Sequence, residues 1–368
     1  MKTNYILEGS VFDRLKDIED ESIQCVVTSP PYWGLRDYGT AEWEGGDSDC
    51  SHKRESKKSE KTITGHKNFE EMNGVGDAIY KSVCNRCGAI RKDKQLGLEE
   101  TPEEFVDNLV KMFREVKRVL RKDGTVWLNL GDSYIGGGRG YDYCKDGTVQ
   151  MAHIKAGVKY GKPTGKIKGL KAKDLCGIPW RVAFALQSDG WYLRQDIIWH
   201  KPNPMPESVQ DRCTKAHDYI FLLTKSAKYF YDSDAVREPV SEISLKRAEY
   251  GWDCDRPSTK NASMNGKGIH TKKMGNRFVN PDGRNKRSVW TITTKPYKEA
   301  HFATFPPELP ELCIKAGSRE GDIVLDPFFG SGTTGWVAQR LGRKWIGVEL
   351  NPEYIKIAEK RFMQQELF

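Results

Sequence analysis

A glycine-rich turn from Asp326 to Thr334 constrains the fold of this 368-residue chain more than any other segment. The apolar residues 323–325 precede the turn, and a helical pattern over 333–341 follows it directly. Glycines let the backbone approach a ligand closely, and the start of a helix directs amide donors toward it. A further apolar strand, 345–348, ends at Glu349, whose carboxylate can accept both hydroxyls of a ribose. The pattern predicts an α/β sheet that holds a nucleotide-like cofactor at the carboxyl ends of its strands.

A second motif, Ser29-Pro30-Pro31-Tyr32, follows a predicted strand over 23–28. The two prolines fix φ and lack amide donors, so they hold the Pro30 carbonyl outward. The exocyclic amine of a nucleic-acid base is a poor nucleophile, because its lone pair is delocalised into the ring. Hydrogen bonds to the Ser29 hydroxyl and the Pro30 carbonyl would favour a more tetrahedral nitrogen, and Tyr32 offers a stacking face to an extruded base. By itself the tetrapeptide is equally typical of an ordinary turn.

Together the two motifs resemble the S-adenosylmethionine-dependent DNA amino-methyltransferases that act on cytosine N4 or adenine N6. The catalytic motif precedes the cofactor motif, which is the order of the family's beta class. The resemblance implies an α/β, Rossmann-like methyltransferase fold, circularly permuted, with a mixed sheet and helices on both faces. It implies catalytic roles for Ser29, Pro30, Pro31 and Tyr32. It implies cofactor contacts from Phe305, Asp326, Pro327, Phe328, Gly330, Ser331, Gly332, Thr333, Thr334 and Glu349.

Serine at the first position of the catalytic motif is more typical of N4-cytosine enzymes, whereas aspartate is more typical of N6-adenine enzymes. We therefore expect site-specific methylation of cytosine N4 in double-stranded DNA, with adenine N6 as the alternative. An alternative of another class is an inert, zinc-containing nucleic-acid-binding protein. The chain also departs from the family: Ser10 follows Gly9 where the family often has aspartate, and Asp13 is a candidate substitute for that adenine contact.

A metal site is predicted within a polar stretch that interrupts the fold. Cys50-x-His52 and Cys84-x-x-Cys87 supply the ligands of a structural zinc knuckle, with His66 as a competing fourth ligand and free thiols as the alternative. Because all four positions would be protein ligands, none remains for substrate. Nine cysteines without an export signal make a disulfide framework improbable.

Several elements follow from local signals. Thr101-Pro102 predicts the start of a helix, and Gly124 predicts its end. The apolar pattern predicts a strand over 125–130, a helix over 178–187, and strands over 191–199 and 219–223. The methyltransferase resemblance covers roughly 4–38, 100–135, 176–232 and 288–365. We expect seven segments: a catalytic part (1–38), the zinc insertion (39–99), core (100–135), a basic loop (136–175), core (176–232), a target-recognition region (233–287) and the cofactor-binding part (288–368).

The charge distribution bears on the partners. The net charge is +8, and seven lysines face one aspartate between residues 151 and 175. Such runs are often solvated loops, but their interleaved glycines favour contact with phosphates. We expect double-stranded DNA as the partner, with a homodimer and a cognate restriction endonuclease as further candidates. No apolar run approaches the ~20 residues of a membrane span, so no membrane partner is expected and the protein should be cytoplasmic, in a bacterium or phage-infected cell.

Overall fold

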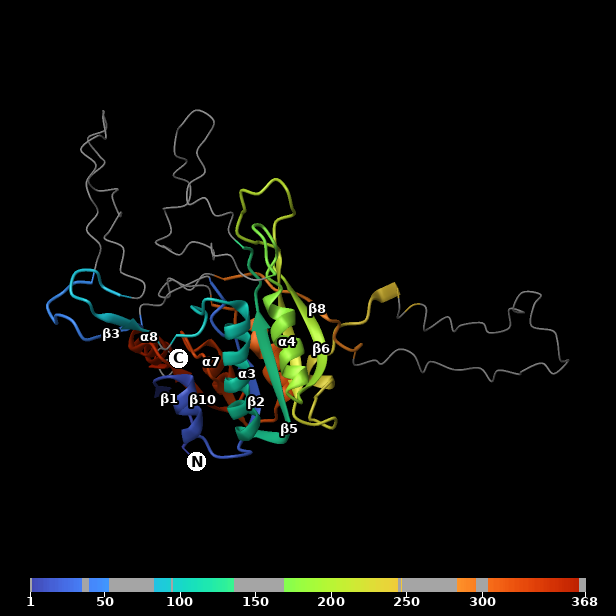
Figure 1. Cartoon of the computed structure of the whole chain (residues 1–368). Helices are drawn as coiled ribbons and strands as arrows, with labels where there is room; N and C mark the ends of the chain where they lie inside the picture. The colour runs from blue at the N-terminus through green and yellow to red at the C-terminus, as the bar shows by residue number, and fades with distance from the viewer. Residues whose placement is uncertain are drawn as a thin grey trace, which may run out of the picture.

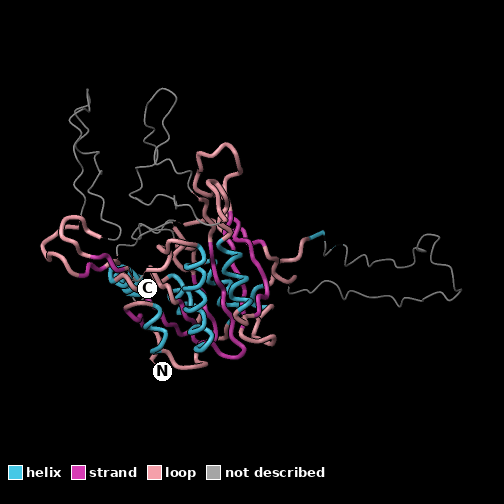
Figure 2. The backbone as a smooth tube through the Cα atoms, in the orientation of Figure 1, coloured by secondary structure: helices cyan, strands magenta, loops and turns pink. Residues whose placement is uncertain are grey.

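The computed structural model describes residues 2–34, 40–52, 83–93, 95–135, 169–243, 246, 283–295 and 304–363. Its centre is an eight-stranded mixed sheet (Figures 1 and 2). In spatial order the strands are β1 (Tyr5–Glu8), β10 (Lys344–Glu349), β9 (Ile323–Asp326), β2 (Ile23–Thr28), β5 (Leu120–Leu130), β7 (His217–Thr224), β6 (Tyr192–His200) and β8 (Val289–Thr291).

Strand direction decides which residues share an edge. The run from β1 to β5 is parallel throughout, β7 is antiparallel to β5, and β6 is antiparallel to β7. The carboxyl ends of the five parallel strands therefore meet the amino end of β7 and the carboxyl end of β6. This edge, where ligands bind in open α/β sheets, carries both motifs.

Alternating residues of the strands bury both faces of the sheet. One core packs against α1 (Val11–Arg14), α3 (Pro102–Val119) and α4 (Ile178–Ser188). The other packs against α6 (Glu308–Gly317), α7 (Thr333–Arg340) and α8 (Pro352–Met363). Two short 3₁₀ turns, η1 (Leu15–Asp17) and η3 (Asp234–Val236), also lie within the described residues. The α/β architecture with helices on both faces is confirmed.

The two ends of the chain join in this sheet, as a circularly permuted fold requires. Strand β1 pairs with β10, where Tyr5 lies opposite Ile346, and α8 packs beside both strands. Within the insertion that carries the predicted metal ligands, β3 (Glu42–Glu44) and β4 (Ile90–Lys92) form a separate antiparallel pair. None of the helices in the described part of the chain is long and apolar enough to span a membrane.

Helix α3 begins as its sequence predicts but ends earlier. The Thr101 hydroxyl accepts a hydrogen bond from the Glu104 amide at 3.2 Å, which caps the first turn. The prediction that Gly124 ends this helix was wrong: α3 stops at Val119, and β5 runs through Gly124. A Cβ on Gly124 would lie 2.7 Å from the Leu120 side chain, so the glycine serves a close approach inside an irregular strand.

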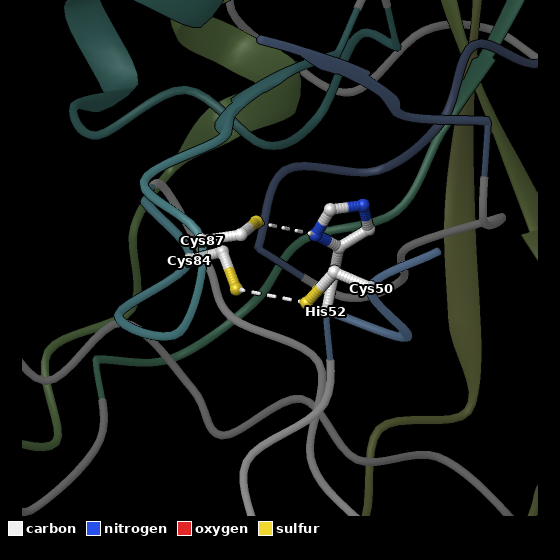
Figure 3. A group of neighbouring side chains, drawn as sticks. All are labelled: Cys50, His52, Cys84 and Cys87. Atoms are coloured by element: carbon white, nitrogen blue, oxygen red, sulfur yellow. Dashed lines mark hydrogen bonds between the residues drawn. The ribbon is translucent and has the colours of Figure 1, made fainter. Parts of the chain in front are cut away.

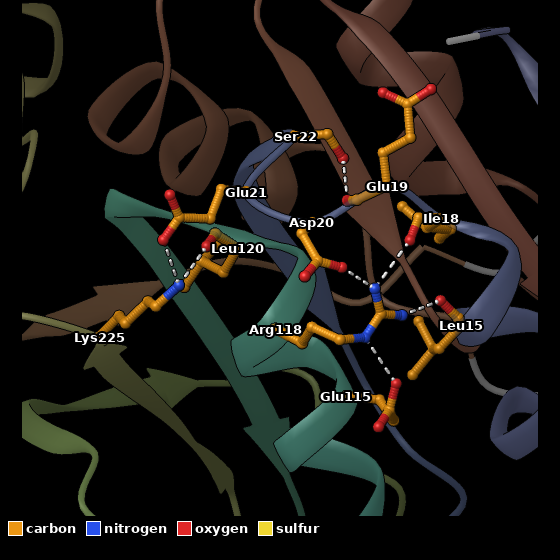
Figure 4. A network of polar contacts seen from close by, with 10 residues as sticks. All are labelled: Leu15, Ile18, Glu19, Asp20, Glu21, Ser22, Glu115, Arg118, Leu120 and Lys225. Atoms are coloured by element: carbon orange, nitrogen blue, oxygen red, sulfur yellow. Dashed lines mark hydrogen bonds and ion pairs between the residues drawn. The ribbon is translucent and has the colours of Figure 1, made fainter.

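The loop that leads into β2 is tied to the end of α3 (Figure 4). The Arg118 guanidinium donates to the carbonyls of Leu15 at 2.8 Å and Ile18 at 3.0 Å, and it pairs with Glu115 and Asp20. Charged donors satisfy these loop carbonyls in place of water. The contacts fix the start of the strand whose other end carries the Ser-Pro-Pro-Tyr turn.

Candidate active site

The two motifs meet at one edge although they lie almost 300 residues apart. Strands β2 and β9 are neighbours, with Val26 opposite Leu325. Beyond that pairing, the Thr28 hydroxyl donates to the Asp326 carboxylate at 2.8 Å. Thr28 directly precedes Ser29, and Asp326 opens the glycine turn, so this hydrogen bond links the strand end that carries the catalytic motif to the cofactor motif. The Thr334 hydroxyl, in the same turn, also lies 3.4 Å from the Val27 carbonyl.

Asp326 is buried and almost fully bonded. Besides Thr28, it accepts from the Phe328 amide at 3.0 Å and the Thr334 hydroxyl at 2.7 Å. A carboxylate has about four acceptor positions, so one remains for a ligand. Burial raises the pKa of Asp326 to about 7, although the three donors oppose that rise.

The glycine turn opens α7 through two left-handed residues, Gly330 and Gly332, with φ values of 51° and 76°. Phe329 points from this turn into the core, where it stacks on Trp345 at 5.1 Å between ring centroids. A Cβ on Gly347 would come within 2.3 Å of the Phe329 ring. Glycine at 347 therefore lets the ring anchor the turn against β10.

Glu349 lies at the end of β10 beside the same turn. One carboxylate oxygen accepts from the Gly330 amide at 2.7 Å, and the other accepts from the Asn351 amide at 2.8 Å. Each oxygen keeps an acceptor position, which suits a vicinal diol such as a ribose. Burial raises the pKa of Glu349, and the backbone donors oppose that rise.

Most of the remaining residues expected at the cofactor site belong to this turn, whereas Phe305 and Asp13 lie elsewhere in the sequence. Pro327 and Ser331 are buried, and the Ser331 hydroxyl has no hydrogen-bond partner in the described part of the chain. The Thr333 hydroxyl accepts from Arg361 at 2.9 Å. Phe305 is half-buried and packs on the core beneath α6 and α7. Asp13 is exposed and lies 4.0 Å from Lys16.

The catalytic turn is held by side chains from two other strands. The Asn129 amide nitrogen, on β5, lies 3.2 Å from the Ser29 hydroxyl and 3.0 Å from the Tyr32 hydroxyl. The Tyr32 hydroxyl also donates to Asp218 at the start of β7, at 3.2 Å. Burial raises the pKa of Tyr32 well above its usual value, and the nearby Asp218 charge adds to the rise, so the phenol stays protonated.

The segment at the end of the insertion, residues 97–99, packs behind this turn. The Gly34 amide donates to the Gly97 carbonyl at 2.8 Å, and the Trp33 indole donates to the Glu99 carbonyl at 2.9 Å. A Cβ on Gly97 would lie 3.1 Å from the Tyr32 carbonyl. The catalytic turn therefore rests on residues 97–99 and on the sheet.

Four potential metal ligands converge in the insertion (Figure 3). The ligand atoms of Cys50, His52, Cys84 and Cys87 all lie within 4.8 Å of one another. The Cys50 and Cys84 sulfurs are 3.8 Å apart, and the Cys87 sulfur lies 3.5 Å from His52 Nδ1. Trp43 stacks on the imidazole at 4.3 Å. Three thiols and one imidazole suit tetrahedral zinc. The competing ligand, His66, lies outside the described residues.

Sequence analysis missed three polar residues of the site: Asn129, Asp218 and Lys201. Asn129 and Asp218 are buried: Asn129 lies among the apolar residues at the end of β5, and Asp218 directly precedes the apolar run of β7. A buried polar side chain within a strand needs a specific partner, and that was the available signal. Asn129 meets its partners through the parallel pairing of β5 with β2, and Asp218 meets Lys201 through the antiparallel pairing of β7 with β6. Local sequence pattern reveals neither pairing.

The fold and the joined motifs define an α/β methyltransferase whose catalytic and cofactor turns come from opposite ends of the chain. A family profile described as DNA methylase matches residues 23–360. The chain belongs to this family of S-adenosylmethionine-dependent DNA amino-methyltransferases.

Similar proteins span nearly the whole chain. Type II methyltransferase M.XycI of Xanthomonas campestris pv. cyanopsidis is 41% identical over 99% of this chain and 89% of its own length. Type II methyltransferase M.SmaI of Serratia marcescens is 39% identical over 98% of this chain and 91% of its own length. The solved structure of the PvuII DNA methyltransferase (cytosine-N4-specific) aligns with a TM-score of 0.55 at 19% identity, covering 98% of this chain and 87% of that one. At this level of identity, the similarity to the PvuII enzyme shows a shared fold alone.

Proposed function

We propose that this enzyme methylates the N4 amine of a flipped cytosine within a specific short sequence of double-stranded DNA. The observation that carries the proposal is the hydrogen bond from Thr28 to Asp326, because it brings the Ser29 turn beside the cofactor turn. Serine at the head of the catalytic turn favours cytosine. The cytosine-N4 specificity in the name of the PvuII enzyme, which shares the fold, points the same way.

In this proposal Ser29 and the Pro30 carbonyl each accept a hydrogen bond from the exocyclic amine. The two bonds hold the nitrogen in a more tetrahedral geometry, with its lone pair directed at the methyl donor. Tyr32 stacks on the flipped base and offsets part of the unstacking cost of a few kcal/mol. The neutral amine needs no strong base to deprotonate it first, because its proton becomes acidic after methylation.

Different residues of the cofactor site would bind different parts of the cofactor. S-adenosylmethionine supplies an electrophilic methyl group on a positively charged sulfonium. Glu349 would accept the ribose hydroxyls through its two remaining acceptor positions. Asp326 would present its remaining acceptor position to the methionine part, and the turn from Pro327 to Thr334 would enclose the ligand under Phe305.

Mass spectrometry of nucleosides from plasmid DNA treated with the enzyme tests the target base. N4-methylcytosine is the expected product, and N6-methyladenine alone would reverse the assignment. The Ser29→Ala variant tests the residue role: it should transfer methyl groups more slowly while its affinity for the cofactor stays normal. Equal loss of both properties would contradict the assigned role. Absence of transfer to any DNA, together with no heat of cofactor binding, would favour an inert nucleic-acid-binding protein.

The proposal includes a structural zinc held by Cys50, His52, Cys84 and Cys87. A bound ion would cross-link the chain that leaves the catalytic turn to the chain that returns toward it. The returning chain continues through β4 to residues 97–99, which contact Trp33 and Gly34. Zinc would thus brace the catalytic turn without touching substrate.

Target recognition is assigned to the stretches outside the methyltransferase core, 39–99, 136–175 and 233–287, which lie largely outside the described residues. Their lysines and arginines would contact DNA phosphates. The Type II designation of the relatives supports a cognate restriction endonuclease as a partner in the cell. A homodimer remains a further proposal, and sedimentation of the protein with and without duplex would test it.

A further inference from the structure

A chain of partly buried hydrogen bonds reaches Ser29 from a charged pair at the ends of the antiparallel strands β6 and β7. Lys201, just beyond β6, forms an ion pair with Asp218. Asp218 accepts from the Tyr32 hydroxyl at 3.2 Å, and the Tyr32 oxygen lies 3.0 Å from the Asn129 amide nitrogen. That nitrogen also lies 3.2 Å from the Ser29 oxygen.

The direction of each bond follows from its chemistry. An ionised carboxylate only accepts, so the Tyr32 proton points to Asp218. The phenol oxygen is then left to accept, which requires the amide nitrogen of Asn129, and not its oxygen, on that side. The second N–H of the same amide is therefore donated to Ser29.

This direction matters for the reaction. A serine hydroxyl without fixed partners could rotate and donate its proton to the target nitrogen, which would occupy the lone pair that must attack the methyl group. Asn129 fills one acceptor position of Ser29, and the Ser29 proton is directed to the Tyr32 oxygen, in a hydrogen bond that opposes the rise that burial gives to the pKa of Tyr32. The lone pair that remains on Ser29 can therefore face the N–H of the amine. The hydroxyl is thereby set as an acceptor before the base arrives.

The ion pair keeps this arrangement from reversing. The Asp218 side chain is 9% exposed and that of Lys201 is 21% exposed, so water screens the pair weakly. The Lys201 ammonium also lies 4.4 Å from the centre of the Trp199 ring, which holds it over the strand. An ionised Asp218 cannot donate to Tyr32, so the bonds between Asp218 and Ser29 keep one direction.

We propose that Asp218 and Lys201 are positioning residues that fix the Ser29 hydroxyl as a hydrogen-bond acceptor, acting through Tyr32 and Asn129. The inference rests on the proposed role of Ser29 toward the exocyclic amine. It adds two residues, both outside the Ser-Pro-Pro-Tyr motif, to the apparatus that orients the base.

The test is a double-mutant cycle on the full-length enzyme, measured as single-turnover methyl transfer to duplex DNA. Asp218→Asn and Tyr32→Phe should each slow transfer by about 10- to 100-fold, the range for hydrogen bonds to charged groups. Because the carboxylate acts through the phenol, the double variant should be no slower than Tyr32→Phe alone. Affinities for S-adenosylmethionine and for DNA should stay within about twofold of wild type, since neither variant removes a ligand contact.

Lys201 and a remote aspartate supply the matched controls. Lys201→Arg should retain most of the rate because it keeps the charge, whereas Lys201→Met should resemble Asp218→Asn. Asp189→Asn makes the same chemical change at an ion pair with Arg114, beyond the end of α4, and should leave transfer unchanged.

Three results would overturn the inference: additive losses in the double variant, a wild-type rate for Tyr32→Phe, or equal rates for the two Lys201 variants. The rate of Tyr32→Phe can be measured whether or not Asp218→Asn folds. If Ser29→Ala itself kept full activity, the proposed function would fail first. A slow Ser29→Ala beside a fully active Asp218→Asn would refute the positioning role alone.

Discussion

Substitution of Gly131 by alanine should displace Tyr32, the residue proposed to stack on the base, without harming the cofactor site. Gly131 follows β5, and a Cβ there would lie 2.3 Å from Cε2 of Tyr32. Ordinary contact begins at 3.4 Å, so the ring or the backbone must move by about 1.1 Å. No left-handed φ is involved, so the added methyl group is the whole perturbation.

A displacement of about 1 Å at a reacting centre can cost ~100-fold in rate. We therefore expect Gly131→Ala to lower single-turnover transfer by about two orders of magnitude, with a stability loss of about 1–3 kcal/mol from overpacking. Calorimetry should show an unchanged affinity for S-adenosylmethionine.

The matched variant is Gly347→Ala, whose Cβ would lie equally close, 2.3 Å, to the Phe329 ring behind the cofactor turn. It should weaken cofactor binding, because the turn from Phe329 to Gly332 must shift. If Gly131→Ala weakened cofactor binding as much as Gly347→Ala does, the division of the site into a base side and a cofactor side would be wrong.

Three further outcomes are expected. Burial raises the pKa of Asp326 from 3.8 to about 7, so its contribution to stability is present below pH ~4 and is lost as the pH rises toward ~7. The unfolding free energy, measured by urea titration, should therefore fall with pH over this range in the wild type, and Asp326→Asn should lack that decrease. The same pH dependence in both proteins would refute the shift. Cys84→Ser with Cys87→Ser should abolish the proposed zinc binding and slow transfer while cofactor affinity persists, and a metal content equal to that of the wild type would remove the zinc proposal. Thr101→Ala should lower the unfolding free energy by about 1 kcal/mol and leave the transfer rate normal. An unchanged unfolding free energy would mean that the cap hydrogen bond does not stabilise the protein.

The sequence predicted the parts of this fold whose signals are local. The apolar strand before Ser29, the cap at Thr101 and the strand-turn-helix around Gly330 all depend on residues within a few positions of one another. The meeting of the two motifs was predicted only by family resemblance. The structure shows the contacts that join them, between β2 and β9.

Elements whose stability comes from distant partners escaped prediction. Among the described strands, β8 is a three-residue edge strand that pairs only with β6, and α6 begins just after consecutive prolines. Strand β5 starts directly at Leu120, with no loop after α3. Leu120 pairs with Ile23 of β2, and this distant pairing, which the sequence does not reveal, decides the boundary in place of the helix-ending signal at Gly124. The Lys201–Asp218 pair likewise exists only once antiparallel β6 and β7 are in register.

The most direct measurement is a structure of the enzyme with a duplex containing its target and an unreactive analogue of S-adenosylmethionine. The account predicts an extruded cytosine stacked on Tyr32, with its exocyclic nitrogen at hydrogen-bond distance, about 2.7–3.2 Å, from the Ser29 hydroxyl. It also predicts the analogue's ribose on Glu349. A base that stays stacked in the duplex, or one that is extruded with its amine directed away from Ser29, would contradict it.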